Sequence, residues 1–347
     1  MIWLVVAMMG CRPAMTFRVT RPAEIAVDQS IQKLAVIDRA GSPASQATSS
    51  AFVDELLALS SPRFTAVSRQ ASRRAFSAVT VTEGDTIRPA QAGAMCKDLN
   101  VTGIVSLEHM QVSDDWFFDT RIEEETTTVT VNGRAREETR EVIVHEATYT
   151  AEIATTWRLY SCQGRVRDFY QTVVHSSFYG EGDTRADARN DVGETDDLQA
   201  DLSVTAAWVY LKRISPYDMD VSRTYYRGWG GDLRQGAKAM RAGNFGVAEK
   251  ALKRSIRAKG GKTKGKALYD LAIVSEQNGD LARALNQARR ANKILDSTLS
   301  NELVRRLRAR KRQDSEIKEQ LDTPPAAVPV LVPVPEPGAP NMVPVER

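Results

Sequence analysis

The chain repeats part of its own sequence between Gly236 and Ile294, with a shift of 36 residues. Gly243-Asn244-Phe245 recurs as Gly279-Asp280-Leu281, and Ala248 recurs as Ala284. Each copy has the pattern of two helices joined by a tight turn, with a small residue where the helices cross. Neither helix pair can bury its apolar face alone, so the pairs must stack on each other. The repetition therefore predicts a helical unit that binds rather than catalyses.

The spacing and the positions of these glycines and alanines resemble tetratricopeptide repeats, whose period is roughly 34 residues. The resemblance implies two repeats over residues 228–298 and a capping helix over 299–321, with Leu299, Leu303 and Leu307 on one stripe. It also implies a shallow groove that binds a protein segment, which a partner or the sheet domain of the same chain would supply. The expected groove-facing residues are Leu233, Met240 and Arg241 of the first repeat and Lys266, Tyr269 and Ile273 of the second.

Charge is distributed unevenly along the chain. Residues 227–321 hold 23 Lys and Arg against 10 Asp and Glu, a net charge of +13, whereas residues 1–226 hold 23 against 31, a net charge of −8. The basic part is expected to bind an acidic surface, either on a partner protein or on the acidic part of this chain. The densest basic run, residues 305–312, contains no aromatic residue that could stack on bases, so nucleic acid is not an expected ligand. We interpret that run as the solvated face of the capping helix, in preference to a membrane contact.

Residues 20–226 have the pattern of a mixed α/β sheet that continues into an antiparallel meander. Strands are expected over 31–37, 64–68 and 101–107, and helices over 45–59 and 89–99, on one face of the sheet. Asn132-Gly133 supplies a type I′ turn between strands over 126–131 and 138–160, and a strand over 167–178 and a helix over 183–213 follow. Neither face of the long hairpin has an uninterrupted apolar row, which favours a solvent-facing sheet extension. The predicted fold class is therefore α+β, with the sheet domain followed by an all-α unit.

The N-terminus resembles the lipobox of bacterial lipoproteins. Met8-Met9-Gly10-Cys11 ends an apolar run that is too short to span a bilayer, which takes about 20 residues. The resemblance implies that residues 1–10 are removed and that Cys11 is acylated, giving a membrane contact through a lipid anchor. Because Arg12 rather than Asp follows the cysteine, the family's sorting rule implies the outer membrane. Cys96 and Cys162 would then lie in an oxidising compartment, either as a pair or as buried thiols.

The order of several short motifs resembles an uncharacterised family of bacterial lipoproteins. These motifs are Arg21-Pro22-Ala23-Glu24-Ile25, Ile31 to Arg39, Thr156 to Tyr160, Arg213-Ile214-Ser215-Pro216 and Arg223-Thr224-Tyr225-Tyr226. In that family a small α/β domain, similar to the domain of the curli-secretion lipoprotein, precedes tetratricopeptide repeats. The resemblance implies a periplasm-facing location in the cell envelope and no particular chemistry.

No catalytic, cofactor-binding or metal-ligating residue is predicted. The sequence contains no Gly-x-Ser-x-Gly elbow, no Cys-x-x-Cys pair and no complete His-Glu-x-x-His motif. The leading hypothesis is a non-enzymatic scaffold or adaptor that binds proteins through its repeats. The alternative is a hydrolase or transferase that uses Asp38, Asp114 or Asp115, since Asp38 follows the first strand of the sheet, where ligands of such sheets bind. Residues 323–347 hold eight of the fourteen prolines and are predicted to form an extended tail.

Overall fold

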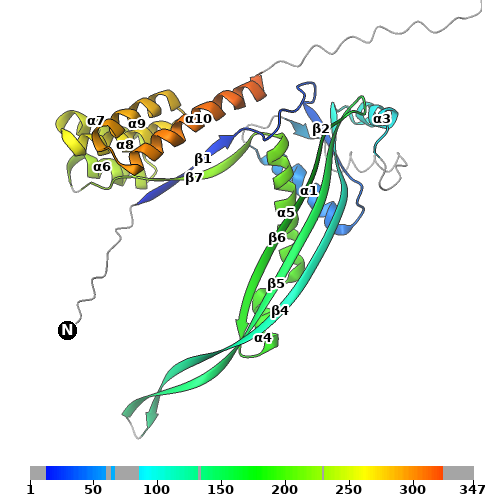
Figure 1. The fold of residues 1–347 in the computed structure, drawn as a ribbon, viewed down its shortest axis with the longest axis horizontal. Helices are drawn as coiled ribbons and strands as arrows, with labels where there is room; N and C mark the ends of the chain where they lie inside the picture. Colours follow the sequence, from blue (N-terminus) through cyan, green and yellow to red (C-terminus); the bar gives the residue numbers. More distant parts are fainter. Residues whose placement is uncertain (1–12, 60–63, 67–85, 132–133, 229, 323–347) are drawn as a thin grey trace, which may run out of the picture.

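A computed structural model describes residues 13–59, 64–66, 86–131, 134–228 and 230–322 (Figure 1). Within them the protein is α+β, with a mixed sheet domain followed by a helical unit, as predicted. The predictions for the lipobox around Cys11, the Asn132-Gly133 turn and the proline-rich tail fall outside the described residues. None of the described helices is long and apolar enough to cross a membrane.

Five strands form the main sheet in the order β3-β2-β4-β5-β6. The strand β2 (Lys33–Asp38) is parallel to β3 (Thr65–Ala66) and to β4 (Gly103–Val131). The strands β4, β5 (Arg134–Ser161) and β6 (Val166–Gly182) pair antiparallel. At about 3.3 Å per residue, β4 and β5 are each roughly 90 Å long, which gives the sheet its elongated shape.

Helices cover both faces of the sheet at its upper end. On one face, α1 (Pro43–Ala58) and α5 (Thr195–Ile214) bring Phe52 and Tyr210 onto Trp157, with ring centroids 5.4 and 5.0 Å from the Trp157 ring. The short helix α4 (Arg185–Val192) extends this layer, while α3 (Pro89–Leu99) packs on the opposite face. The expectation that helices lie on one face was wrong because β2 is apolar on both of its faces: Leu34 faces α1 and Ala35 faces α3.

Cys96 and Cys162 form a disulfide, which decides between the two states that the sequence left open. The bond joins α3 to the turn after β5, with the two Cα atoms 5.7 Å apart and a sequence separation of 66. It therefore fixes the helix on the second face of the sheet to the end of a central strand.

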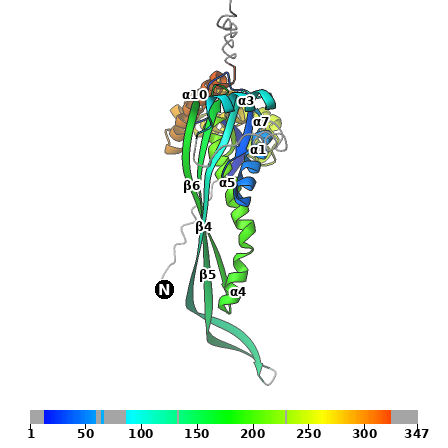
Figure 2. The same cartoon turned by 90° about the vertical axis from the view of Figure 1, so that its right-hand side faces the viewer.

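The strands β4 and β5 continue beyond β6 as a two-stranded arm, which we define as residues 122–131 and 134–143. The last pair between β5 and β6 is His145 with Gly182, whereas β4 and β5 remain paired as far as Val131 and Arg134. None of the described helices packs on the arm, which projects from the lower end of the sheet (Figures 1 and 2). At its base, Arg121 contacts both Glu146 and Glu181 and so joins three strands. A solvent-facing extension of the sheet was predicted.

Two further strands form a separate ribbon that the sequence did not reveal. The strand β1 (Ala14–Arg21) pairs antiparallel with β7 (Tyr217–Thr224) along its whole length. Met15, Phe17 and Val19 alternate with exposed residues and are buried. Their side chains join the core of the helical unit, not that of the main sheet.

The helical unit consists of two helix pairs and a long last helix. The pairs are α6 (Gly231–Arg241) with α7 (Phe245–Ala258) and α8 (Gly261–Gln277) with α9 (Leu281–Leu295), followed by α10 (Thr298–Asp322). Both turns have the same construction: Gly243 and Gly279 adopt φ of 69° and 80°, and the next residues, Asn244 and Asp280, cap the following helix. The local signals of the repeat therefore give equivalent turns.

The ribbon lies against α6 and α8 and is held there by polar contacts. Arg223 of β7 forms a two-pronged ion pair with Glu276 of α8, at 2.9 and 2.7 Å. The backbone N–H of Tyr226 donates to Asp270 Oδ1 at 2.8 Å. At the far end of α10, the Gln320 side chain donates to and accepts from the backbone of Ala23. The ribbon and the helical unit therefore share one core.

We predict that loss of the disulfide destabilises the sheet domain. The Cys96→Ser/Cys162→Ser double variant should have a free energy of unfolding about 2–4 kcal/mol lower than wild type, because the unfolded chain gains the freedom of a long loop. Urea denaturation measures this difference. Reductant should lower the midpoint of the wild type and leave the double variant unchanged; a wild-type midpoint indifferent to reductant would contradict the bond.

We also predict that Asp270 makes stability pH-dependent. Burial raises the pKa of its carboxyl well above the ordinary value of 3.8, against the smaller effects of the Tyr226 hydrogen bond and of Lys266. Asp270 Oδ2 accepts no hydrogen bond in the part of the chain that the structure describes. At pH values between 3.8 and the raised pKa, the folded protein keeps a proton on Asp270 that the unfolded chain releases. The contribution of Asp270 to the free energy of unfolding is therefore complete below pH 3.8 and is lost as pH rises toward and through the raised pKa.

The Asp270→Asn variant removes the ionisation and keeps an oxygen for the Tyr226 N–H. Its free energy of unfolding relative to wild type should therefore increase between pH 5 and pH 8. Chemical denaturation of both proteins at the two pH values measures this difference. A difference that stays constant with pH would show that Asp270 is ionised when folded.

Candidate binding groove on the helical unit

Four of the six predicted groove residues cannot contact a separate partner. Leu233, Met240, Tyr269 and Ile273 are all buried, and they belong to the core that the helical unit shares with the ribbon. The ring of Tyr226, just after β7, lies 5.1 Å from the ring of Tyr269. As sites for a separate partner these four assignments were wrong, because the chain's own ribbon covers the predicted face.

Arg241 and Lys266, the other two predicted residues, remain accessible beside the ribbon. Arg241 lines a cavity of about 280 Å³ together with Tyr225, Arg227 and Arg234. Lys266 lines a second cavity, of about 490 Å³, with its Nζ atom 5.5 Å from the centroid of the Tyr226 ring. These two cations thus flank residues that follow β7, without the apolar surface that was expected between them.

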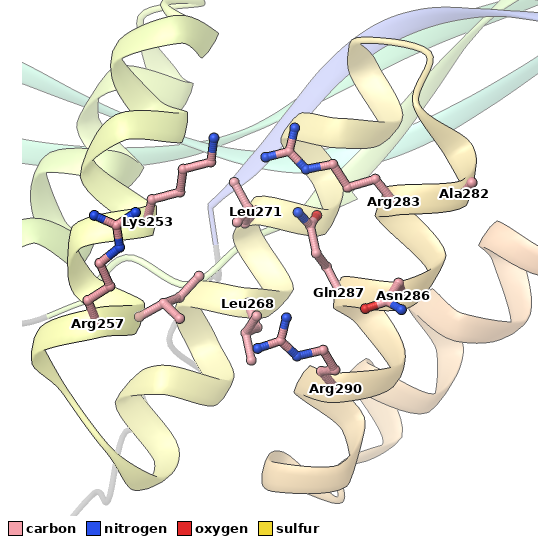
Figure 3. A pocket seen from close by; sticks show the side chains of 10 residues that line it. Lys253, Arg257, Leu268, Leu271, Ala282, Arg283, Asn286, Gln287 and Arg290 are labelled. Atoms are coloured by element: carbon pink, nitrogen blue, oxygen red, sulfur yellow. The ribbon is translucent and has the colours of Figure 1, made fainter.

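A more open groove lies between α7 and α9, over α8 (Figure 3). Its volume is about 540 Å³, within the roughly 300–1,000 Å³ typical of ligand sites. In Figure 3 the basic side chains project from α7 and α9 toward the space between these helices, and α8 supplies apolar residues behind them. The lining residues are Lys253, Ile256, Arg257, Leu268, Leu271, Ala282, Arg283, Asn286, Gln287 and Arg290.

The two ends of the groove differ in charge. At one end, Glu249 accepts from Lys253 at 2.7 Å and from Arg283 at 2.6 Å, and hydrogen bonds from Lys253 first and Arg283 second lower the pKa of its carboxyl. At the other end, Arg257 and Arg290 have no ion-pair partner in the described part of the chain. The groove therefore presents two uncompensated guanidinium groups next to two cations that share one carboxylate.

The local sequence explains this arrangement. Lys253 and Arg257 are four residues apart on α7, so they lie on the same side of that helix, and Arg283 and Arg290 are two turns apart on α9. Gln287, between the latter two, is buried and accepts from Ser275 Oγ of α8 at 2.9 Å, which holds α9 against α8. The spacing of the four cations could have been found in the sequence. The sequence did not show which side of the helices remains open.

The groove can bind anions, and its described lining residues include no carboxylate, histidine, serine or cysteine. Guanidinium groups bind carboxylates through two parallel hydrogen bonds, and the accessible side chains of Ile256 and Ala282 can contact aliphatic side chains. No group of three or more potential metal ligands occurs within the described ranges. The geometry fits a segment that carries both acidic and apolar side chains.

The three carboxylates of the enzymatic alternative do not converge. Asp38 accepts from the backbone N–H of Ala40 and from Ser45 Oγ, so it shapes the turn into α1. Asp114 accepts from the Tyr149 hydroxyl at 3.1 Å, and Asp115 accepts from the next backbone N–H. These contacts assign structural roles to all three side chains.

One buried polar cluster in the sheet domain was not found from the sequence. Glu108 occupies a bulge in β4 and pairs with Arg39, which directly follows β2, and it also accepts from the Tyr160 hydroxyl at 2.8 Å. Burial raises the pKa of Tyr160 above its ordinary value. The cluster fixes the end of β2 against the bulge. The sequence offered no signal for it, because a bulge is defined only by strand pairing.

The chain matches two family models. One, described as a domain of unknown function (DUF8603), covers residues 16–226, which include the ribbon and the main sheet. The other, also described as a domain of unknown function (DUF6340), covers residues 234–320 of the helical unit. No curated protein and no solved structure matches the chain. Since the first model covers more than half of the sequence, the chain belongs to the DUF8603 family.

Proposed function

We propose that this protein is a non-enzymatic adaptor of the bacterial cell envelope that binds an acidic protein segment in the groove between α7 and α9. The observation that carries the proposal is the unpaired Arg257 and Arg290 on an open surface beside the accessible apolar side chains of Ile256 and Ala282. Both features have a physical cost in isolation, since cations that line one groove repel each other and accessible apolar surface is hydrated. A partner with carboxylate and aliphatic side chains relieves both costs.

The equivalent turns of the two helix pairs support a tetratricopeptide-like reading of the helical unit. In this reading the ribbon takes the place of a peptide on the face formed by α6 and α8. A separate partner then binds on the other side, where α7 and α9 are open. Nucleic acid is not the proposed ligand, because the groove lining contains no aromatic side chain on which a base could stack.

A location in the envelope is supported by the disulfide between Cys96 and Cys162, because such bonds persist in oxidising compartments. The lipobox-like sequence around Cys11 supports a lipid anchor, and Arg12 after the cysteine favours the outer membrane with the protein facing the periplasm. The anchor would hold the adaptor at the membrane and leave the groove accessible to periplasmic proteins.

We predict that the groove binds an acidic peptide through Arg257 and Arg290. The Arg257→Glu/Arg290→Glu variant should bind a fluorescein-labelled peptide rich in Glu and Leu about 10- to 100-fold more weakly than wild type, since each charge-assisted hydrogen bond contributes about 1.5–3 kcal/mol. Fluorescence anisotropy measures the affinity. Added salt should also weaken wild-type binding, because the screening length falls from about 8 Å at 0.15 M to about 3 Å at 1 M.

The matched control is Arg241→Glu/Lys266→Glu, which makes the same change in net charge beside the ribbon. It should reduce affinity far less than the groove variant. Equal losses in the two variants would mean that net charge alone attracts the peptide, and an unaffected groove variant would place the binding site elsewhere.

We also predict that Cys11 carries a lipid. Labelling with a palmitate analogue in a bacterial host should mark the wild type and leave the Cys11→Ala variant unmarked, since acylation needs the cysteine thiol. The variant should also leave the membrane fraction, because a single protein-bound anchor is then absent. Equal labelling of the two proteins, or of neither, counts against the anchor.

A further inference from the structure

We propose that the acidic segment bound by the groove is the arm of a second copy of this chain, so that molecules associate head to tail. The inference rests on the proposed function of the groove and names its partner. It is carried by a match between the groove and one face of the arm in charge, apolar surface and position in the molecule.

One face of the arm presents two isoleucines followed by two glutamates. Ile122 pairs with Ile143 across the two strands, and two residues further Glu124 pairs with Glu141. Side chains two residues apart on a strand share a face, so these four lie together. The isoleucines are 70% and 59% exposed, an unusual state for large aliphatic side chains.

The two glutamates have no local counter-charge. Glu124 and Glu141 form a directly opposed pair of like charges, which destabilises a sheet. Neither has an ion-pair partner within the described ranges, whereas on the other face of the arm Glu125 is paired with Arg140 at 2.6 Å. Glu124 and Glu141 therefore lie on the same face of the arm as the exposed isoleucines, whereas Arg140 lies on the other face.

The groove offers the complementary surface. Arg257 and Arg290 supply two unpaired cations, and Ile256 and Ala282 supply accessible apolar surface beside them, whereas Leu268 and Leu271 behind them are buried. Docking would place two carboxylates against two guanidinium groups and two isoleucines against the apolar surface of the groove. The like-charge repulsion within each partner would be relieved by the other.

The arm cannot fill the groove of its own molecule. In both views it projects from the end of the sheet opposite to the helical unit (Figures 1 and 2). The two complementary surfaces therefore meet only between molecules, and they are different surfaces. Such a heterologous contact continues from copy to copy and yields a ring or an open chain.

Sedimentation velocity of the full-length chain tests this inference, with Cys11→Ala present so that no lipid contributes to association. The chain with an unchanged arm and groove should associate in a concentration-dependent way, and added salt should weaken this association. The arm variant Glu124→Lys/Glu141→Lys and the groove variant Arg257→Glu/Arg290→Glu should each raise the dissociation constant at least about tenfold. Because the arm variant replaces one like-charge pair with another, its own strand pairing should change little. The control Glu125→Arg/Arg140→Glu, on the other face, should associate as the wild type does.

Mixing the arm and groove variants provides the decisive measurement. Each reversed arm then meets a reversed groove, and each native arm meets a native groove, so the mixture should associate although neither variant does alone.

A wild type that stays monomeric while the groove binds the Glu- and Leu-rich peptide would overturn the inference and leave the adaptor function intact, with a foreign protein as partner. Association that persists in both variants would also overturn it, because another surface would then be responsible. A wild type that neither binds the peptide nor associates would instead contradict the proposed function itself.

Discussion

The buried ion pair between Arg223 and Glu276 is the interaction on which the arrangement of this protein depends. Their side chains are only 8% and 0% exposed, and two hydrogen bonds join them. Removal of either partner would leave an uncompensated buried charge, at a cost of about 3–5 kcal/mol. The ion pair therefore requires that β7 remain on α8 whenever the helical unit is folded. The ribbon, rather than the main sheet, shares the core of the helical unit.

This constraint decides which surfaces of the helical unit can function. The face of α6 and α8 serves the fold, since it buries Phe17 and Val19 of the ribbon among its own leucines and alanines. The proposed binding groove lies on the opposite side, where basic residues of α7 and α9 meet solvent. The contact with the ribbon and the proposed contact with a partner would thus use different helices of the same unit.

Local signals predicted several turns and helix starts, whereas the full length of β4 and the pairing of β1 with β7 were not predicted. The turns at Gly243 and Gly279 and the helix start at Pro89 follow from residues within one or two helical turns. The ribbon pairs Ala14 with Thr224, and the short alternation around Phe17 did not identify a strand without knowledge of its partner. The candidate site follows the same division: the charges were visible in the sequence, but the open side of the helices depends on where the ribbon lies.

The arm illustrates how a costly feature can carry function. A two-stranded hairpin is only marginally stable in water, and this one adds an opposed glutamate pair and exposed isoleucines. Salt would act on such an arm in two ways: it screens the attraction between arm and groove, and it relieves the repulsion between Glu124 and Glu141 in the free molecule. Both effects stabilise the free state relative to the bound state. Association through this arm should therefore depend on ionic strength more steeply than two simple ion pairs would, because the free arm gains what the complex loses.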